Sequence, residues 1–140
     1  MPDQYDVAVI GGGVVGSTIA RELGRYRLKT ILLEREADVA RGTSGKNSGV
    51  VHTGINVPTG SLKAKYNVAG AAIYEQFCAD LDVPYQKCGK LIVALDDSQA
   101  PDLEALKARG DANGVPELEI IDSAEVKRLE PNIVGAAAVS

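Results

Sequence analysis

The sequence predicts an α/β protein that opens with a parallel β-α-β unit. Three observations predict it: a short apolar run, a glycine-rich turn directly after it, and a second apolar run that ends in an acidic residue. Residues 7–10 read Val-Ala-Val-Ile, which is typical of a parallel strand buried on both faces. Residues 29–33 form the second run, and Glu34 follows it. We therefore expect a strand at each run and a helix between them.

The turn between the two runs carries a recognisable spacing. Residues 11–16 read Gly-Gly-Gly-Val-Val-Gly and contain G-x-G-x-x-G. Apolar residues then recur at four-residue spacing, as on one face of a helix, at Val15, Ile19 and Leu23. Glu34 lies 18 residues after Gly16, near the roughly 20 expected for an acid that accepts hydrogen bonds from a ribose. Together these features form the dinucleotide fingerprint of a Rossmann unit.

Each part of this fingerprint has a chemical reason. Gly11 permits a tight turn, Gly13 lets the backbone approach a pyrophosphate, and Gly16 lets the helix pack close to the strands. The helix N-terminus offers free N–H groups and a partial positive charge to the phosphates. A carboxylate at Glu34 would repel a 2′-phosphate, which argues against NADP. The alternative is a glycine-rich turn without a ligand, which the surrounding strand, helix and acid disfavour.

A long helix is expected in the middle of the chain. Ser61 is a candidate N-cap for a helix that runs to about Leu81. Its apolar residues recur at spacings of three and four, and we expect them to face a core: Leu62, Tyr66, Ala69, Ile73, Phe77 and Leu81.

The remaining elements alternate between strand and helix. We expect strands at 91–95 and 118–121, a helix over 101–112, and the opening of another strand at 135–140. Pro101 would lie in the first turn of its helix, where its missing N–H costs little. Asp122 and Glu125 resemble a capping box before a short helix that Pro131 ends.

Composition limits the possible partners and locations. The chain has 140 residues and a net charge of −4, which argues against nucleic acid. Residues 39–74 nevertheless carry four basic residues and no acidic one, which suits an anionic cofactor or substrate; the alternative is a solvated basic loop. The first strand begins too near Met1 for a signal peptide to precede it, and no apolar run has the length of a membrane span. We expect a cytoplasmic location, with a peripheral position at the inner face of the membrane as the alternative.

These motifs resemble the glycine/D-amino-acid oxidase superfamily of flavoproteins, and within it the FAD-dependent glycerol-3-phosphate dehydrogenases. The resemblance rests on residues 11–17, 19–23, 25–26, 32–34, 42–44, 47–52, 60–65, 88–89, 113–116 and 129–132. L-2-hydroxyglutarate dehydrogenases share many of these segments, including residues 88–94.

The resemblance implies a glutathione-reductase-like, Rossmann-like FAD-binding βαβ unit, followed by the start of an α+β substrate domain. We place the FAD-binding part at residues 1–80 and the beginning of the substrate or cap domain at 81–140. A Rossmann sheet needs more than two strands to bury both faces. We therefore expect an incomplete N-terminal portion, completed by sequence after Ser140 or by a second polypeptide.

The resemblance places FAD along two segments of the chain. In such flavoproteins the segment that matches residues 43–52 follows the cofactor, because small residues admit its pyrophosphate and ribityl chain and hydroxyl and N–H groups donate to its oxygens. The expected cofactor-binding residues are Gly11, Gly13, Val15, Gly16, Glu34, Arg35, Thr43, Ser44, Asn47, Ser48, Gly49, Val50 and His52. The alternative is a plain loop, whose ordering without a ligand would cost entropy.

His52 is the only histidine and the only candidate catalytic residue. The resemblance places it near the flavin and the substrate. There it could accept the proton of a substrate hydroxyl, hold the flavin through a hydrogen bond, or fill space, and the sequence leaves these roles open. Residues 55–57 lack the Arg or Tyr that some relatives carry close to substrate, so no substrate contact is assigned to them.

The resemblance implies an FAD-dependent oxidoreductase acting on a CH–OH group. Hydride would pass from a secondary alcohol of a small anionic substrate to the flavin, with glycerol 3-phosphate favoured and L-2-hydroxyglutarate second. Electrons would continue to a quinone or another redox protein. An alternative of another class is a non-catalytic nucleotide-binding subunit that another chain completes. An NAD-binding domain is disfavoured because it has no need of residues 43–52.

Overall fold

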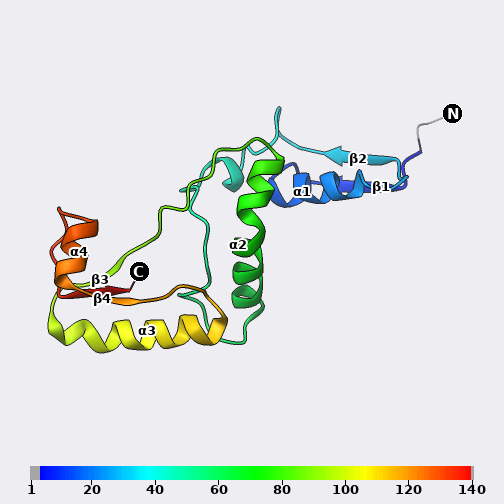
Figure 1. Ribbon diagram of the computed structural model, residues 1–140. Helices are drawn as coiled ribbons and strands as arrows, with labels where there is room; N and C mark the ends of the chain where they lie inside the picture. The colour runs from blue at the N-terminus through cyan, green and yellow to red at the C-terminus, as the bar shows by residue number, and fades with distance from the viewer. Residues whose placement is uncertain (1–3, 140) are drawn as a thin grey trace. The chain divides into compact units, whose positions relative to one another are not determined.

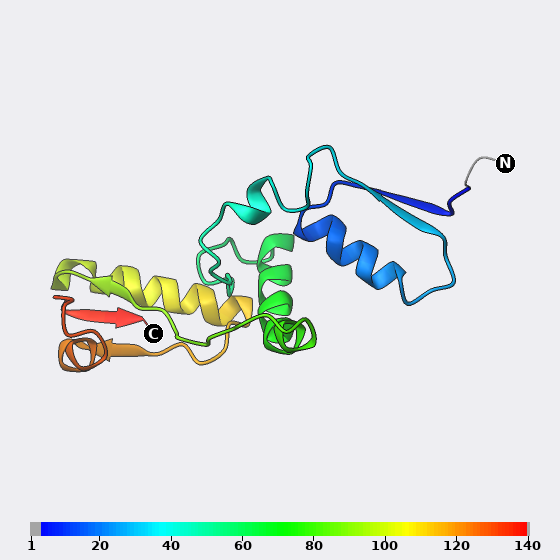
Figure 2. The same ribbon diagram turned by 90° about the horizontal axis from the view of Figure 1, so that it is seen from above.

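The computed structural model describes residues 4–139, which form two compact units that divide after Val50 (Figures 1 and 2). Each unit contains its own sheet. This packing boundary differs from the functional boundary expected after residue 80, because the helix that precedes residue 80 packs with the second unit. Ser140, in the last expected strand, lies outside the described residues.

The first unit is the predicted β-α-β unit. Strand β1 (Val7–Ile10), helix α1 (Val14–Leu23) and strand β2 (Thr30–Leu33) follow in that order. The two strands are parallel, with Val7 opposite Thr30 and Ile10 opposite Leu33. Figure 2 shows α1 running alongside this pair of strands. The carboxyl ends of both strands therefore lie at one edge of the sheet, where a Rossmann unit binds its ligand.

The two-sided burial expected for residues 7–10 is wrong for the described residues. Val9 is buried, but Ile10 is 86% exposed. On α1, Val15 and Ile19 of the apolar stripe are exposed as well. The physical reason is that, within residues 4–139, this sheet has two strands and its unit has one α-helix, α1, to cover them.

The second unit is an α+β arrangement around a three-stranded antiparallel sheet. Its elements are α2 (Leu62–Asp80), β3 (Ile92–Ala94), α3 (Ala100–Asn113), β4 (Ile120–Asp122), α4 (Ser123–Leu129) and β5 (Ala137–Val139). Strand β5 lies between β3 and β4. Helix α3 packs on this sheet (Figure 1), and the core contains Ile55, Ala94, Leu103 and Val139.

Predicted helix boundaries are largely confirmed by their caps. The Ser61 hydroxyl accepts a hydrogen bond from the Ala64 N–H at 3.1 Å. The Asp122 carboxylate accepts one from the Glu125 N–H at 2.9 Å. The reciprocal half of that capping box does not form, because the Glu125 carboxylate binds the Arg128 guanidinium instead. Helix α3 ends at Asn113, and its C-cap Gly114 has the left-handed φ of 82°.

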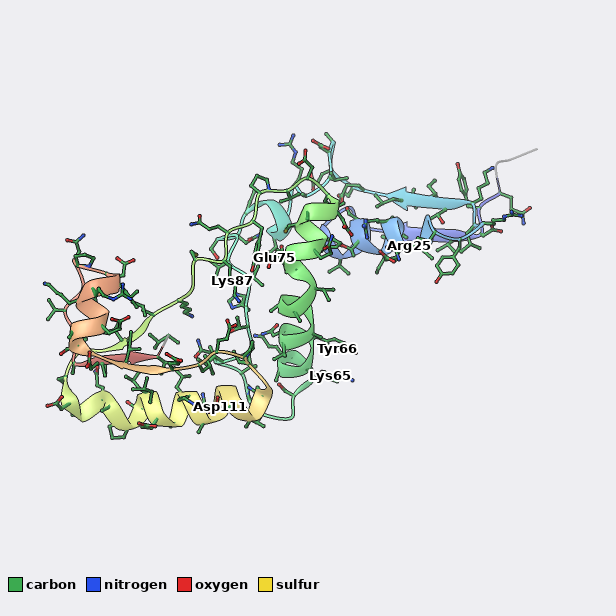
Figure 3. The ribbon with its side chains drawn as sticks, viewed as in Figure 1. Arg25, Lys65, Tyr66, Glu75, Lys87 and Asp111 are labelled. Carbon is green, nitrogen blue, oxygen red and sulfur yellow. The ribbon has the colours of Figure 1, made fainter. Side chains whose placement is uncertain are left out.

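The apolar stripe expected to face a core on α2 is wrong. Leu62 is 71% exposed and Tyr66 is 64% exposed, and Figure 3 shows Tyr66 projecting outward from the helix. The buried side of α2 instead contains small residues, Ala64 and Cys78 among them. Gly54, at φ 107°, lies against this side, and an added Cβ there would come within 3.2 Å of Val68. Because this loop approaches α2 closely, the side of the helix with small residues is the one that becomes buried.

Replacing the α2 cap tests its contribution to stability. Ser61→Ala removes the acceptor for the Ala64 N–H and should lower the free energy of unfolding of the complete protein by about 1 kcal/mol. Denaturant unfolding measures this change. Thr59→Ala, at an exposed position two residues earlier, is the control and should stay within about 0.5 kcal/mol of wild type. Equal stability of the two variants would contradict the capping role.

Candidate cofactor site

The glycine turn joins β1 to α1 through a left-handed residue and a close approach of the backbone. Gly11 has the left-handed φ of 101°, and its N–H donates to the Leu33 carbonyl at 2.8 Å. A methyl group on Gly16 would collide with the Gly11 carbonyl oxygen. Glycine at these two positions therefore lets α1 begin directly against the end of β1, as the fingerprint predicts.

Glu34 organises the same turn from the end of β2. One carboxylate oxygen accepts a hydrogen bond from the Gly12 N–H at 2.6 Å, and the other accepts one from the Glu36 N–H at 2.9 Å. These N–H groups, that of Glu36 first and that of Gly12 second, hold the pKa of Glu34 below its ordinary value. Each carboxylate oxygen keeps a further lone pair, which a ribose hydroxyl can use. The contact with Gly12 was not expected from the sequence.

A second segment of the first unit lies against the turn. The Ala40 N–H donates to the Gly12 carbonyl at 3.0 Å. The Ser44 hydroxyl accepts from the Val14 N–H at 2.9 Å, across 30 positions in the sequence. Ser44 thereby satisfies the first free N–H of α1. The two segments that the sequence assigned to one ligand are thus neighbours.

The N-terminus of α1 retains unpaired donors beside this junction. Within residues 4–139 no hydrogen-bond acceptor is found for the N–H groups of Val15 and Gly16. Val15 and Gly16 line the larger of two clefts. The smaller cleft, of about 330 Å³, lies at the same junction and is lined by Gly13, residues 34–36 and residues 40–44. A second, open cleft of about 510 Å³ runs over β1 and the first turns of α1, and Gly13 and Ser44 line both clefts. Free N–H groups and the helix dipole make such a place suitable for an anion.

Asn47 orders the segment that follows. Its side-chain NH₂ donates to the carbonyls of Thr43 at 3.1 Å and Ser44 at 2.8 Å, and its Oδ1 accepts from the Gly49 N–H at 2.8 Å. The amide is therefore used within its own loop, around the short helical turn Thr43–Gly45. Asn47 supports the segment, and its side-chain donors are not directed to a ligand.

The other expected residues lie as follows. The Arg35 side chain is exposed and its Nε donates to the Glu36 carboxylate at 3.1 Å. Thr43 lines the smaller cleft, whereas Ser48, Gly49 and Val50 are exposed at the end of the first unit. His52 belongs to the second unit, and its side chain is exposed there.

Sequence reasoning missed part of the cleft lining. Ala40, Arg41 and Gly42 line it together with the expected residues. The Arg41 guanidinium lies 3.8 Å from the Asp38 carboxylate, so an ion pair holds this basic side chain. The signal was present in the acid-free, basic composition of residues 39–74, which pointed to a segment and not to a residue.

Comparison with known proteins shows to which family this chain belongs. The family DAO, described as FAD dependent oxidoreductase, matches residues 6–140. The chain belongs to this family. Over 139 residues it is 45% identical to the mitochondrial L-2-hydroxyglutarate dehydrogenase of Nematostella vectensis, which covers 98% of this chain and 30% of that protein. It is 42% identical to the glycerol 3-phosphate dehydrogenase of Caloramator mitchellensis, covering 92% of this chain and 27% of that protein.

A solved structure of an FAD dependent oxidoreductase shares this fold. The FAD-bound, dithionite-reduced L-α-glycerophosphate oxidase of Mycoplasma pneumoniae superposes with a TM-score of 0.87 at 36% identity, over 98% of this chain and 37% of that one. The chain thus spans about a third of the length of the relatives it matches. The α/β fold and FAD as the cofactor are both confirmed.

The residues present fit FAD. Its pyrophosphate needs donors and an uncluttered backbone, and the free N–H groups of Val15 and Gly16 and the bare Cα of Gly13 could supply them. Its adenosine ribose needs an acceptor, and the Glu34 carboxylate could serve as one.

A single methyl group should disrupt this arrangement. Gly16→Ala places a Cβ against the Gly11 carbonyl, so the turn must open and the complete protein should lose at least about tenfold in FAD affinity. Titration of the apoprotein with FAD measures it. Gly70→Ala, on α2 with open space around it, is the matched control and should leave FAD affinity unchanged while adding about 0.5–1 kcal/mol of helix stability. Stoichiometric flavin in purified Gly16→Ala would contradict the turn assignment.

Glu34 should give the first unit a specific pH dependence. Because its pKa is lowered on folding, the stability it contributes is complete above its ordinary pKa of 4.5 and is lost as the pH falls through the lowered value. The difference in unfolding free energy between wild type and Glu34→Gln should therefore be constant above that pH and shrink below it. Urea unfolding over a pH series measures it. A difference that grows on acidification would contradict the assignment.

Proposed function

We propose that this chain holds the adenosine and pyrophosphate of FAD in a dehydrogenase that oxidises a secondary alcohol of a small anionic substrate. The observation that supports this most is the hydrogen bond between Val14 N–H and the Ser44 hydroxyl, because it joins the two segments that a single FAD would need. When bound, FAD would supply the acceptor for a hydride. Residues 1–80 would serve the cofactor and residues 81–140 would begin the substrate part.

The chain's own groups would divide the binding. The N–H groups of Val15 and Gly16 would donate to the pyrophosphate, with Gly11 and Gly13 keeping the approach open. Glu34 would accept from the ribose, and Arg35 would lie at the rim of the adenosine cleft. The hydroxyl and N–H groups of residues 43, 44 and 47–50 would follow the cofactor toward its flavin end.

His52 would lie where this segment meets the flavin and the substrate. A neutral imidazole there can accept the proton that leaves the substrate hydroxyl. The same group can instead donate a hydrogen bond to the flavin, and both roles require that its position be fixed. Support comes from its place in the sequence, directly after the cofactor-following segment.

Glycerol 3-phosphate is the favoured substrate, and L-2-hydroxyglutarate is the second candidate. The Mycoplasma pneumoniae structure and the Caloramator mitchellensis relative are named for glycerophosphate, which supports the first. The Nematostella vectensis relative, with the higher identity, is named for L-2-hydroxyglutarate, which supports the second. Both substrates carry a secondary hydroxyl near an anionic group, so the chemistry is shared.

Electrons would leave the flavin for a quinone or a redox protein. Within residues 4–139 no helix has both the length and the apolar character needed to cross a membrane. We propose a cytoplasmic location, with peripheral contact to the inner face of the membrane if the acceptor is a quinone. The two cysteines, Cys78 and Cys88, are free thiols, which suits a reducing compartment. A second polypeptide that completes the fold would make this chain a non-catalytic binding subunit, which the assay below separates.

Anaerobic flavin bleaching distinguishes these substrates. The complete protein should be purified with bound flavin and mixed with glycerol 3-phosphate or L-2-hydroxyglutarate in the absence of oxygen. Loss of the flavin band near ~450 nm with glycerol 3-phosphate is expected, because hydride transfer removes the oxidised chromophore. Bleaching with L-2-hydroxyglutarate alone would select the second substrate. Bound flavin that neither compound bleaches, even at high concentration, would overturn the dehydrogenase proposal and leave the binding-subunit reading.

A further inference from the structure

Asn113, the last residue of α3, fastens a distant loop. Its side-chain NH₂ donates to the Gly54 carbonyl at 2.9 Å and to the Val57 carbonyl at 3.0 Å, across 59 and 56 positions in the sequence. Both amide hydrogens are thereby used. Its Oδ1 is buried and has no hydrogen-bond partner within the described residues. The side-chain NH₂ of Asn113 therefore binds only residues 54–57 among the described residues.

Packing holds the same loop from the other side. Ile55 and Val57 are each 8% exposed, and Ile55 belongs to the core of the second unit. Gly110, one turn earlier on α3, makes room for this loop, because a Cβ there would come within 3.2 Å of Ile55. The position of the loop is therefore fixed by two hydrogen-bonded carbonyls, by two buried apolar side chains and by the space that Gly110 leaves.

An asparagine at this place suits the loop more than the helix. Asparagine is a weak helix former, and an unpaired buried oxygen carries a desolvation cost. A leucine would avoid both costs but would leave the carbonyls of Gly54 and Val57 unpaired. An aspartate has the same shape but presents acceptors to acceptors. Of these, only the amide offers two donors from a short side chain.

We infer that Asn113 is a positioning residue for His52. The carbonyl that Asn113 holds belongs to Gly54, two residues after His52. The His52 side chain is exposed and no hydrogen bond to it is found within residues 4–139. The anchored backbone that begins at Gly54 therefore limits where the imidazole can lie. This inference rests on the proposed function, in which His52 meets the flavin and the substrate.

A positioning role for Asn113 and a general loss of stability have different kinetic consequences. If Asn113 acts through His52, its loss must slow flavin reduction while FAD, held by the first unit, stays bound. The loss must also have no further effect once His52 is gone, because energies of residues that act as one unit do not add.

The test uses Asn113→Asp in the complete protein, with Asn132→Asp as the matched control. Asn132 is exposed in the same unit, so the control makes the same amide-to-carboxylate change without touching the loop. Hydrogen exchange of residues 52–57 is measured in the apoprotein, and the rate of anaerobic flavin reduction in the flavin-loaded protein. Both are repeated in a His52→Ala background. Asn113→Ala, which removes the donors without adding charge, replaces the aspartate variant if that variant does not fold.

We expect exchange in residues 52–57 to accelerate by roughly tenfold or more in Asn113→Asp, and not in Asn132→Asp. Flavin content should stay at wild-type level, flavin reduction should slow by about tenfold, and the slowing should vanish in the His52→Ala background. Unchanged exchange would overturn the loop anchor, and faster exchange with unchanged reduction would overturn the link to His52. A slowing that persists without His52 would assign Asn113 a merely structural role. If wild-type flavin is not reduced by either alcohol, the proposed function fails and the link to His52 fails with it, whereas the exchange data still decide the anchor.

Discussion

The contact between Gly16 and the carbonyl of Gly11 is the constraint on which the first unit depends. It places the start of α1 against the end of β1 with no side chain between them. The free N–H groups of the helix then lie at the edge of the sheet where Glu34 follows β2. Ser44 binds the same helix start, because its hydroxyl accepts from the Val14 N–H. Binding geometry here follows from backbone proximity more than from any side chain.

The second unit solves a different problem with similar means. Gly54 and Gly110 admit close packing, and Asn113 supplies donors where the loop exposes carbonyls to the interior. The segment between residues 43 and 57 is therefore held at both ends. Ser44 and Asn47 hold the end that belongs to the first unit, and Asn113 holds the end that belongs to the second. In the proposed function this segment presents groups to a cofactor and a substrate, and such supports would fix where those groups lie.

Much of this could be predicted from the sequence, because local rules decide it. The fingerprint of residues 11–16, the caps Ser61 and Asp122, and the left-handed Gly114 depend on neighbouring residues alone. The exposed stripe of α2 could not be predicted, because periodicity shows that a face is apolar but not which partner covers it. The same limit applies to Ile10, whose burial needs strands that residues 4–139 do not contain.

Within the site, the limit of prediction lies in hydrogen bonds of long sequence separation. Spacing assigned Glu34 to a ribose but gave no sign that its carboxylate accepts a hydrogen bond from the Gly12 N–H. Asn47 was expected to face a ligand, and its amide instead ties the loop together. Asparagine and glutamate side chains can form hydrogen bonds with many polar groups, and the folded backbone decides which of these groups lie within reach.

The end of α3 has a chemical consequence for the lifetime of the chain. Asn113 precedes a glycine, the pairing in which a backbone nitrogen most easily attacks the side-chain amide and releases ammonia. In the folded helix the Gly114 nitrogen is held by the carbonyls of Asp111 and Gly110, which keeps it from that attack. Fraying of the last turn would remove the protection and turn this donor into a carboxylate. The stability of the last turn of α3 thus sets how slowly Asn113 loses its amide.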